Sequence, residues 1–550
     1  MDRRDFLTVG GPRSRDAIRG INRGNPAGRD ASQNAPIVFA RRSASDLNPY
    51  NGEWTYTQAA HLMRRCMFGP TETEIRTALS DGLNTTLMKL FTPFEPSLAG
   101  IDSWASGTQF QALPDPAKGE DGPAFQQILF QRRDEVLYWI QRTMATGEVS
   151  IQERMRFFWH SHFTSEIQVV RYAEVVYEQY RLFKSHMLGN FKQFVRDVTV
   201  DMAMLIYLDG IKNYKFGARD NINENYAREL MELFTMGVFD WEGNENYSQD
   251  DVIAAARSLS GWTYNVDQGN PRGQIYVDRA SVFNPLLWDS GQKTLMGRTG
   301  AWNTDDVIDI LFEQRADQIA KFICTKIYRA FVYDVPDPVV VEQMANLFRS
   351  ENWEIRPVME VLLKSEHFFD VTNIGALHKG PIDYLIGIVR SEKLTSVPAV
   401  DLVAERRAAN DLTARLITLG QVPYSPPNVK GWPGGRTWTS TSTLPVRQKF
   451  AIDVAAGNLT SGRNPLYVFD PVAFARLFPE PDDLRALSDD MAAFLLNTVP
   501  SDPESTLLFE TILDGGKDYE WSLDDPDQKA GERIRKFVQA AVQLAKFQLY

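Results

Sequence analysis

Residues 223–237 read Asn-Glu-Asn-Tyr-Ala-Arg-Glu-Leu-Met-Glu-Leu-Phe-Thr-Met-Gly, and they place charged side chains on an otherwise apolar helix. At about 3.6 residues per turn, Glu224, Arg228 and Glu232 form one row, with Glu229 in a second row beside it. The apolar neighbours leave little room for a solvated face, so we expect these charges to lie where partners are required. The stretch is therefore either a functional site or a structural brace.

The composition is that of a globular chain, and it excludes several classes of protein. The sequence has 550 residues, of which 43% are hydrophobic and 24% are charged, so it is long enough for a large core. Its net charge of -12 argues against nucleic-acid binding, because phosphate recognition requires a basic face. The chain has two cysteines, Cys66 and Cys324, which lie far apart in the sequence. Their number and spacing argue against a disulfide framework and against a cysteine-built zinc site. No apolar run reaches the roughly 18 residues of a membrane span, so we expect no transmembrane segment.

Residues 1–50 differ from the rest of the chain. They are rich in Arg, Gly, Asn and Pro and show no apolar periodicity, which predicts a disordered basic N-terminal arm. Residues 3–7, Arg-Arg-Asp-Phe-Leu, resemble a twin-arginine export motif, but the apolar segment of such a signal does not follow them. The sequence therefore leaves the localisation open.

Residues 51–550 are expected to form one large helical domain. Thr71 and Glu74 have the spacing of a capping box for a helix that ends at Gly82, and Ser248 and Asp251 begin another helix. Apolar residues recur with a helical period over 125–146, 151–163, 172–188, 305–331, 338–349, 356–364, 381–391, 404–419, 471–477, 483–497 and 528–547.

One region is predicted to form sheet. Between residues 264 and 300, short β-prone pieces such as Gln274–Val277 alternate with Gly, Asn and Pro, which predicts a β-hairpin insertion. The expected fold class is therefore mainly α, a large single multi-helix domain with a small inserted β-hairpin region.

A second group of polar residues lies in the segment Phe-Phe-Trp-His-Ser-His-Phe at residues 157–163. His160 and His162 point in different directions on a regular helix, so they cannot both bind one metal ion from it. Each is either a partly buried ring bonded to backbone or part of a metal or acid/base site with the charged helix. In the second case, we expect one histidine within hydrogen-bonding reach of Glu229 or Asn225, and Arg228 buried between carboxylates.

The third candidate segment is a loop at residues 425–438, Ser-Pro-Pro-Asn-Val-Lys-Gly-Trp-Pro-Gly-Gly-Arg-Thr-Trp. Its density of Pro and Gly is incompatible with helix or strand interiors. Asn428, Lys430 and Arg436 are able to hydrogen-bond a sugar, carboxylate or phosphate, with Trp432 offering a flat apolar face. The alternative is that the tryptophan is a hydrophobic latch.

Four segments in this order resemble a bacterial family called domain of unknown function 1800. They are Phe-Trp-His-Ser-His-Phe at 158–163, Asn-Glu-Asn-Tyr-Ala-Arg-Glu-Leu at 223–230, Arg-Ser-Leu-Ser-Gly-Trp at 257–262 and Pro-Pro-Asn-Val-Lys-Gly-Trp-Pro-Gly-Gly at 426–435. The resemblance extends from about Thr55 to the end of the chain. It implies a mostly helical protein, often exported, often encoded beside a second family that is similar to sulfatases and alkaline phosphatases. It implies no known reaction.

The resemblance also marks individual positions. The family commonly has histidine at the positions of Phe234 and Trp288, and this chain departs from it at both. The residues that match the family pattern are His160, His162, Arg228, Glu229, Arg257, Asp289, Lys293 and Asn428.

Two functions of different classes remain open at this stage. The favoured one is a helical scaffold that binds a sulfatase- or phosphatase-like neighbour or an envelope glycan. The alternative is a metal- or acid/base-dependent hydrolase that acts on a polar polymer or envelope substrate, with a divalent metal as its candidate cofactor. The candidate catalytic residues are His160, His162, Glu229 and Arg228, and the candidate substrate-binding residues are Asn225, Arg257, Lys293, Asn428, Trp432 and Arg436.

Overall fold

The fold is mainly α-helical, as the sequence predicts. The structure is a computed structural model that describes residues 39–41, 43, 45–105, 122–217, 219–264, 280–391, 402–461, 464–496 and 498–550. Helices make up 59% of it, and its strands pair as short two-stranded antiparallel sheets.

The elements follow one another with short connections. In the N-terminal half the helices are α2 (Tyr56–Cys66), α3 (Glu72–Leu90), α4 (Asp102–Ala105), α5 (Pro123–Thr146), α6 (Gln152–His162), α7 (Ile167–Val170), α8 (Ala173–Ser185), α9 (Phe191–Thr199), α10 (Met202–Tyr207), η4 (Gly210–Lys212), α11 (Asn225–Glu229), η5 (Leu230–Thr235) and α12 (Gln249–Ser258).

The C-terminal half is built in the same way. Its helices are η6 (Pro285–Leu287), α13 (Thr304–Gln314), α14 (Ala316–Phe331), α15 (Pro338–Ser350), α16 (Ile355–Leu363), α17 (Pro381–Ser391), α18 (Leu402–Leu419), η7 (Gly435–Trp438), α19 (Thr443–Ala456), α20 (Pro471–Ala475), α21 (Leu484–Leu496), α22 (Asp502–Leu513), η8 (Asp518–Glu520), η9 (Pro526–Gln528), α23 (Ala530–Ala541) and η10 (Ala545–Gln548).

The predicted sheet insertion is present between α12 and α13. Strands β3 (Trp262–Tyr264) and β4 (Ser281–Phe283) pair antiparallel, and β5 (Lys293–Leu295) forms a hairpin with β6 (Arg298–Gly300). Further short pairs join β1 (Tyr214–Phe216) to β2 (Arg219–Asn221) and β7 (Thr460–Ser461) to β8 (Asn464–Pro465). The β-prone stretch at residues 274–277 lies outside the described residues.

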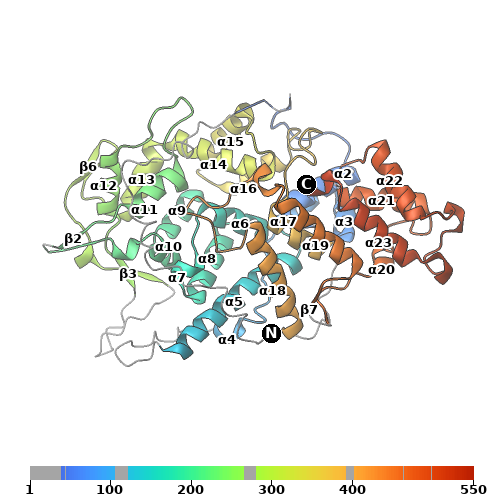
Figure 1. Cartoon of the computed structure of the whole chain (residues 1–550). Helices are drawn as coiled ribbons and strands as arrows, with labels where there is room; N and C mark the ends of the chain where they lie inside the picture. The colour runs from blue at the N-terminus through green and yellow to red at the C-terminus, as the bar shows by residue number, and fades with distance from the viewer. Residues whose placement is uncertain are drawn as a thin grey trace.

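The helices pack into an elongated body in which the first and last helices of the sequence meet. Figure 1 shows α2 and α3 beside the C-terminal helices α21 and α22, while α10 to α13 lie at the opposite end. Arg64 Nη2 in α2 donates to the Phe494 carbonyl of α21 at 2.6 Å, and Arg76 of α3 pairs with Asp490 at 3.1 Å. Buried apolar residues from α2 to η10 form one contiguous core cluster.

Both predicted capping boxes are confirmed. Thr71 accepts from the Glu74 amide while the Glu74 carboxylate accepts from the Thr71 amide, and Ser248 and Asp251 exchange the same pair of bonds. These bonds satisfy amides that the first helical turn leaves free, so the local sequence determines where α3 and α12 begin.

One predicted helix boundary is confirmed and another is wrong. Gly82, with φ of 78° and ψ of 167°, interrupts α3 with a non-helical residue, so the helix that begins after Thr71 ends there and a second helical segment continues to Leu90. The helix predicted over residues 305–331 is broken at Arg315, which has φ of -131° and separates α13 from α14.

Most of the predicted N-terminal arm, residues 1–38 with Arg42 and Ala44, lies outside the described residues. The last part of the segment is packed on the body. Ser45 Oγ donates to Asp370 Oδ2 at 2.7 Å, and the Tyr50 amide donates to the Lys364 carbonyl at 2.7 Å.

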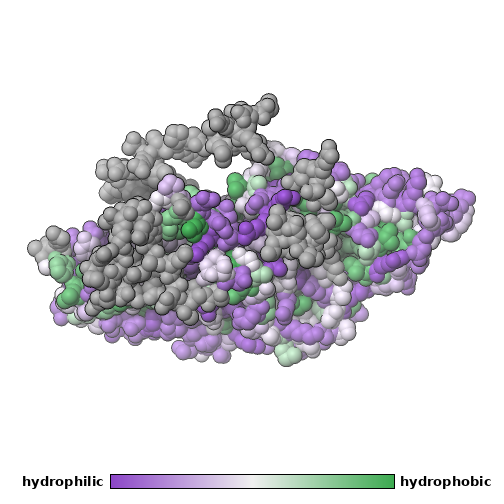
Figure 2. All heavy atoms as spheres, turned by 90° about the horizontal axis from the view of Figure 1, so that it is seen from below, coloured by the Kyte–Doolittle hydropathy of each residue, from purple (hydrophilic) through white to green (hydrophobic). Residues whose placement is uncertain are grey.

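None of the described helices is long and apolar enough to cross a membrane. The face shown in Figure 2 is mostly hydrophilic where it is coloured, with hydrophobic residues scattered in small patches.

Candidate functional site

The charged stretch at residues 223–237 is not a regular α-helix. It begins as α11 and continues as the π-helix η5, in which the Met236 amide bonds the Met231 carbonyl five residues back, at 3.1 Å. A π-turn is wider than an α-turn, so residues on either side of Glu229 lose the i, i+4 alignment. π-Turns occur often at functional sites, which makes this irregularity a reason to examine its side chains.

The π-turn separates the charges that α-helical spacing places in one row. Arg228 Nη2 lies 3.0 Å from Glu224 Oε2 and 3.1 Å from Gln249 Oε1, with the side chains of the ion pair 36% and 37% exposed. Glu232 instead accepts from the Tyr247 hydroxyl at 3.2 Å. The expectation of a buried Arg228 held between carboxylates is therefore wrong, because the wider turn carries Glu232 away from it.

His162, at the end of α6, holds the π-turn in place. Its Nε2 lies 3.0 Å from the Phe234 carbonyl, and its Nδ1 lies 2.8 Å from Lys326 Nζ. Since a carbonyl only accepts, Nε2 carries the proton and Nδ1 accepts from the lysine. Lys326 Nζ also donates to the Leu233 carbonyl at 2.9 Å. The two side chains thus satisfy carbonyls that the π-turn leaves free.

Burial lowers the pKa of both groups, so that His162 is neutral and Lys326 is close to its titration midpoint at neutral pH. Burial lowers the pKa of His162 far below its ordinary value, and the charge of Lys326 lowers it further. Burial, with a smaller contribution from Arg329, lowers the pKa of Lys326 to about 7. No carboxylate pairs with Lys326 among the described residues.

His160 performs a similar task for the loop that precedes residue 425. Its Nε2 accepts from the Tyr424 amide at 2.8 Å, and its ring stacks on the Tyr424 ring at 4.0 Å between centroids. Burial lowers the pKa of His160 to about 3, so the ring is neutral at physiological pH. Within the described part of the chain, neither histidine hydrogen-bonds Glu229 or Asn225, contrary to the contact expected from the sequence.

The Pro/Gly loop packs directly on the end of α6. Thr164 Oγ1 donates to the Val429 carbonyl at 2.5 Å, and Gly431 has φ of 82°. A Cβ atom at Gly431 would lie 2.4 Å from the Ser161 carbonyl, so the close approach requires glycine. The Trp432 ring stacks on the Phe157 ring with 5.3 Å between centroids, and it contacts the His160 ring edge-on. This indole packs as a latch, and the loop thereby places Lys430 Nζ 3.9 Å from Glu232 Oε1.

Glu229 makes no hydrogen bond or ion pair among the described residues, and its side chain is half-buried. The buried Nδ1 of His160 and Nε1 of Trp432 likewise have no hydrogen-bond partner there. Burial raises the pKa of Glu229 to about 7, and Glu232 raises it further while Lys430 and Arg228 oppose the change. Burial raises the pKa of Tyr207, and the negative charges of Glu166 and Glu229 raise it further. A carboxyl that is half-protonated near neutrality therefore lies in a cluster of acids, phenols and one lysine.

The comparison with protein families identifies one family. A family model described as "Protein of unknown function (DUF1800)" matches residues 61–549. The chain belongs to the DUF1800 family. No curated protein and no solved structure matches the chain.

A second polar cluster of the DUF1800 domain lies where α12 meets the inserted strands. Arg257 Nε donates to Asp289 Oδ2 at 2.7 Å, and Lys215 lies 3.3 Å from the same oxygen. Burial raises the pKa of Asp289, but bonds from Arg257 and the Gly291 amide outweigh it and lower the pKa to about 2. Asp289 is therefore a permanently ionised brace.

Lys293 belongs to this cluster and not to the Glu229 site. Its Nζ donates to the Trp302 carbonyl at 2.9 Å and lies 4.9 Å from the centroid of the Trp288 ring. Burial lowers the pKa of Lys293 to about 8. Trp288 therefore packs beside the amino group of Lys293.

The other predicted ligand-binding residues lie in different places. Asn225 is exposed, with Nδ2 3.4 Å from the Leu208 carbonyl. Asn428 Oδ1 accepts from the Lys430 amide at 2.9 Å and shapes the loop. Arg436 is exposed, and its charge acts on Asp334 at the far end of the loop. The functional roles of these residues stay predictions.

Among the described residues, no group of three or more His, Cys, Asp or Glu side chains is arranged to hold a metal ion.

Three residues of the site, Lys326, Glu166 and Tyr207, were not predicted from the sequence. Lys326 does carry a signal, because it interrupts the apolar face of α14 formed by Ile319, Ile323 and Ile327. Glu166 and Tyr207 carry none, since their proximity to Glu229 arises only from tertiary packing.

Proposed function

We propose that this DUF1800 protein is a helical scaffold that binds an envelope glycan at the surface around Glu229, Glu232 and Lys430. The observation that carries the proposal is the Glu229 carboxyl, which is half-buried, has a pKa of about 7 and makes no hydrogen bond among the described residues. Burying a polar group without a partner is costly, so a ligand that supplies one is favoured.

The neighbours of Glu229 suit sugar hydroxyls. A protonated carboxyl donates and accepts, Lys430 donates, and the phenol of Tyr207 does both. Polar groups of this kind, placed beside aromatic rings, fix the orientation of a sugar ligand.

A binding role is favoured over hydrolysis by the state of the two motif histidines. His160 and His162 both bond backbone groups and are neutral at physiological pH. Both nitrogens of His162 and Nε2 of His160 are held in these contacts, and Nδ1 of His160 is buried without a partner among the described residues.

The test is binding of the purified protein to an array of bacterial envelope polysaccharides. Wild-type protein is expected to bind at least one glycan, and Glu229→Gln to change its affinity because it removes the proton-dependent donor and acceptor. Glu351→Gln is the matched control, since Glu351 is an exposed glutamate elsewhere on the surface. Absence of glycan binding together with capture of a sulfatase- or phosphatase-like protein would replace the glycan with a protein partner.

A second candidate function is acid/base hydrolysis of a polar polymer, and the pKa of Glu229 favours it specifically. A general acid or base works best when its pKa lies near the working pH. If Glu229 serves this role, Glu229→Gln abolishes release of reducing ends from a bound polysaccharide but leaves binding intact. Equal, nonzero hydrolysis by the wild type and the variant would exclude Glu229 from the chemistry.

A further inference from the structure

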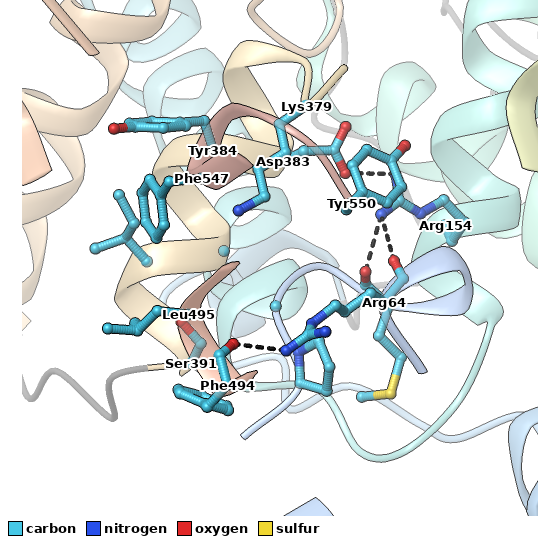
Figure 3. A pocket seen from close by; sticks show the side chains of 15 residues that line it. Arg64, Arg154, Lys379, Asp383, Tyr384, Ser391, Phe494, Leu495, Phe547 and Tyr550 are labelled. Atoms are coloured by element: carbon cyan, nitrogen blue, oxygen red, sulfur yellow. Dashed lines mark hydrogen bonds and ion pairs between the residues drawn. The ribbon is translucent and has the colours of Figure 1, made fainter. Parts of the chain in front are cut away.

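A cavity near the N-terminal end of α6 is lined by more cationic than acidic side chains. It lies where α2, α6, α17 and α21 meet the C-terminal segment, away from the π-turn, and Figure 3 shows the side chains around it. Its cationic lining residues are Arg64, Arg154 and Lys379, and its one acidic lining residue is Asp383. The lining therefore carries an excess of positive charge.

Arg154 is the cation that the acid neutralises. Its Nη1 lies 2.5 Å from Asp383 Oδ1, and its Nη2 donates to the Met67 carbonyl at 2.8 Å. The guanidinium also lies 4.2 Å from the Phe68 ring centroid. Its Nε is buried and has no hydrogen-bond partner among the described residues.

Arg64 is the cavity arginine that has no direct ion pair among the described residues. Its side chain is buried, and its Nη2 donates to the Phe494 carbonyl at 2.6 Å. Burial lowers its pKa, and the more distant charges of Tyr56 and Glu72 offset this only in part. A buried charge without a partner costs several kcal/mol, so an anion in the cavity would offset that cost.

The shape of the cavity limits what that anion can be. The cavity volume is about 50 Å³. At roughly 10–15 Å³ for each water, this is space for a few water molecules, comparable to a tetrahedral oxyanion and smaller than a sugar or nucleotide. The amino group of Lys379 points into the space between Phe547 and Tyr550, opposite the two arginines. The donors thus approach the cavity from two sides.

We propose that this cavity binds a tetrahedral oxyanion, phosphate or sulfate, either free or as the terminal group of a monoester. Arginine forks match the oxygens of such a group, and amines supply a point charge. The proposal is independent of the glycan surface at Glu229, so either can fail without the other.

Calorimetric titration of the full chain with sodium phosphate and with sodium sulfate tests the proposal. Saturable binding of one anion per chain is expected, and Arg64→Met should weaken it about tenfold or more, because a hydrogen bond to a charged group is lost. Ser391→Asp should also weaken binding by placing a carboxylate at the rim, without removing the buried arginine contacts. This second variant decides the matter if Arg64→Met does not fold.

The matched control is Ser350→Asp, at the end of α15, which should leave binding unchanged. Phenyl phosphate distinguishes the two sources: binding as tight as that of phosphate supports a terminal group, and exclusion supports the free ion. The proposal is overturned if wild-type protein binds neither anion at millimolar concentration. It is equally overturned if Ser391→Asp binds as tightly as the control.

Discussion

Replacing Glu229 with glutamine should stabilise the protein above neutral pH and have little effect in mild acid. The carboxyl has a pKa of about 7 in the folded protein and an ordinary value of 4.5. Between these values the folded state binds more protons than the unfolded state, so the stability of the wild type falls as pH rises. The free-energy cost of ionising Glu229 in the folded protein is therefore small near pH 5 and reaches its full size above pH 7. A glutamine at this position does not ionise and carries no such cost.

The magnitude follows from the size of the shift. At about 1.36 kcal/mol per pKa unit, a shift from 4.5 to about 7 corresponds to roughly 3 kcal/mol. The partial exposure of Glu229 reduces this through solvent screening, so we expect a gain of about 1–2.5 kcal/mol at pH 8 relative to pH 5. At an unfolding entropy of about 2 cal/mol/K per residue over residues 61–549, the gain corresponds to about 1–3 °C in Tm.

Differential scanning calorimetry of Glu229→Gln and wild-type protein from pH 5 to pH 8 measures this difference. Glu351→Gln, the exposed control, should show no change of ΔTm with pH. The reasoning is refuted if ΔTm of Glu229→Gln stays constant over that range, or if the variant loses stability as pH rises. Either result would mean that Glu229 is ionised in the folded protein and has a partner.

Three further substitutions test the contacts around the π-turn. Gly431→Ala places a Cβ atom 2.4 Å from the Ser161 carbonyl at positive φ, and it should destabilise the protein by about 1–3 kcal/mol in urea denaturation. Arg228→Ala removes an exposed ion pair with Glu224 and a hydrogen bond to Gln249, so a loss of about 1 kcal/mol or less is expected, and a loss above about 3 kcal/mol would show that the arginine is buried after all. His160→Phe leaves a buried backbone amide without an acceptor and should cost about 1–3 kcal/mol, equally at pH 5 and pH 8, because the histidine is neutral at both.

Local signals in the sequence are sufficient to predict the fold class and the helix starts. Thr71 and Ser248 begin helices because each bonds an amide three residues later, an interaction confined to one turn. The sheet insertion is likewise marked by its own composition. The glycine at position 82 marks the end of the first helical segment of α3, because it adopts a positive φ that other residues avoid. The break at Arg315 carries no such signal, since the apolar period of the sequence runs through it.

The π-turn could not have been predicted in the same way. Residues 223–237 have a helical apolar period whichever turn they adopt. The Leu233 and Phe234 carbonyls lie in the last turn of η5, and the groups that satisfy them, Lys326 and His162, come from distant parts of the chain. The charged row derived from α-helical spacing is therefore wrong at Glu232, although its first pair, Glu224 and Arg228, is present.

The buried histidines His160 and His162 differ from Glu229 in how far hydrogen bonds within the fold compensate for the burial of their side chains. A neutral imidazole offers one donor and one acceptor at a fixed distance, so His162 joins a carbonyl to a lysine and His160 accepts a backbone amide. Bonds within the fold account for the burial of His162, whereas Nδ1 of His160 is buried without a hydrogen-bond partner among the described residues. No bond accounts for the burial of Glu229, because its carboxyl has none among the described residues and loses water. Proteins retain such costs mainly where a ligand or a reaction requires them, so Glu229 marks the functional surface more directly than the histidines that hold it in place.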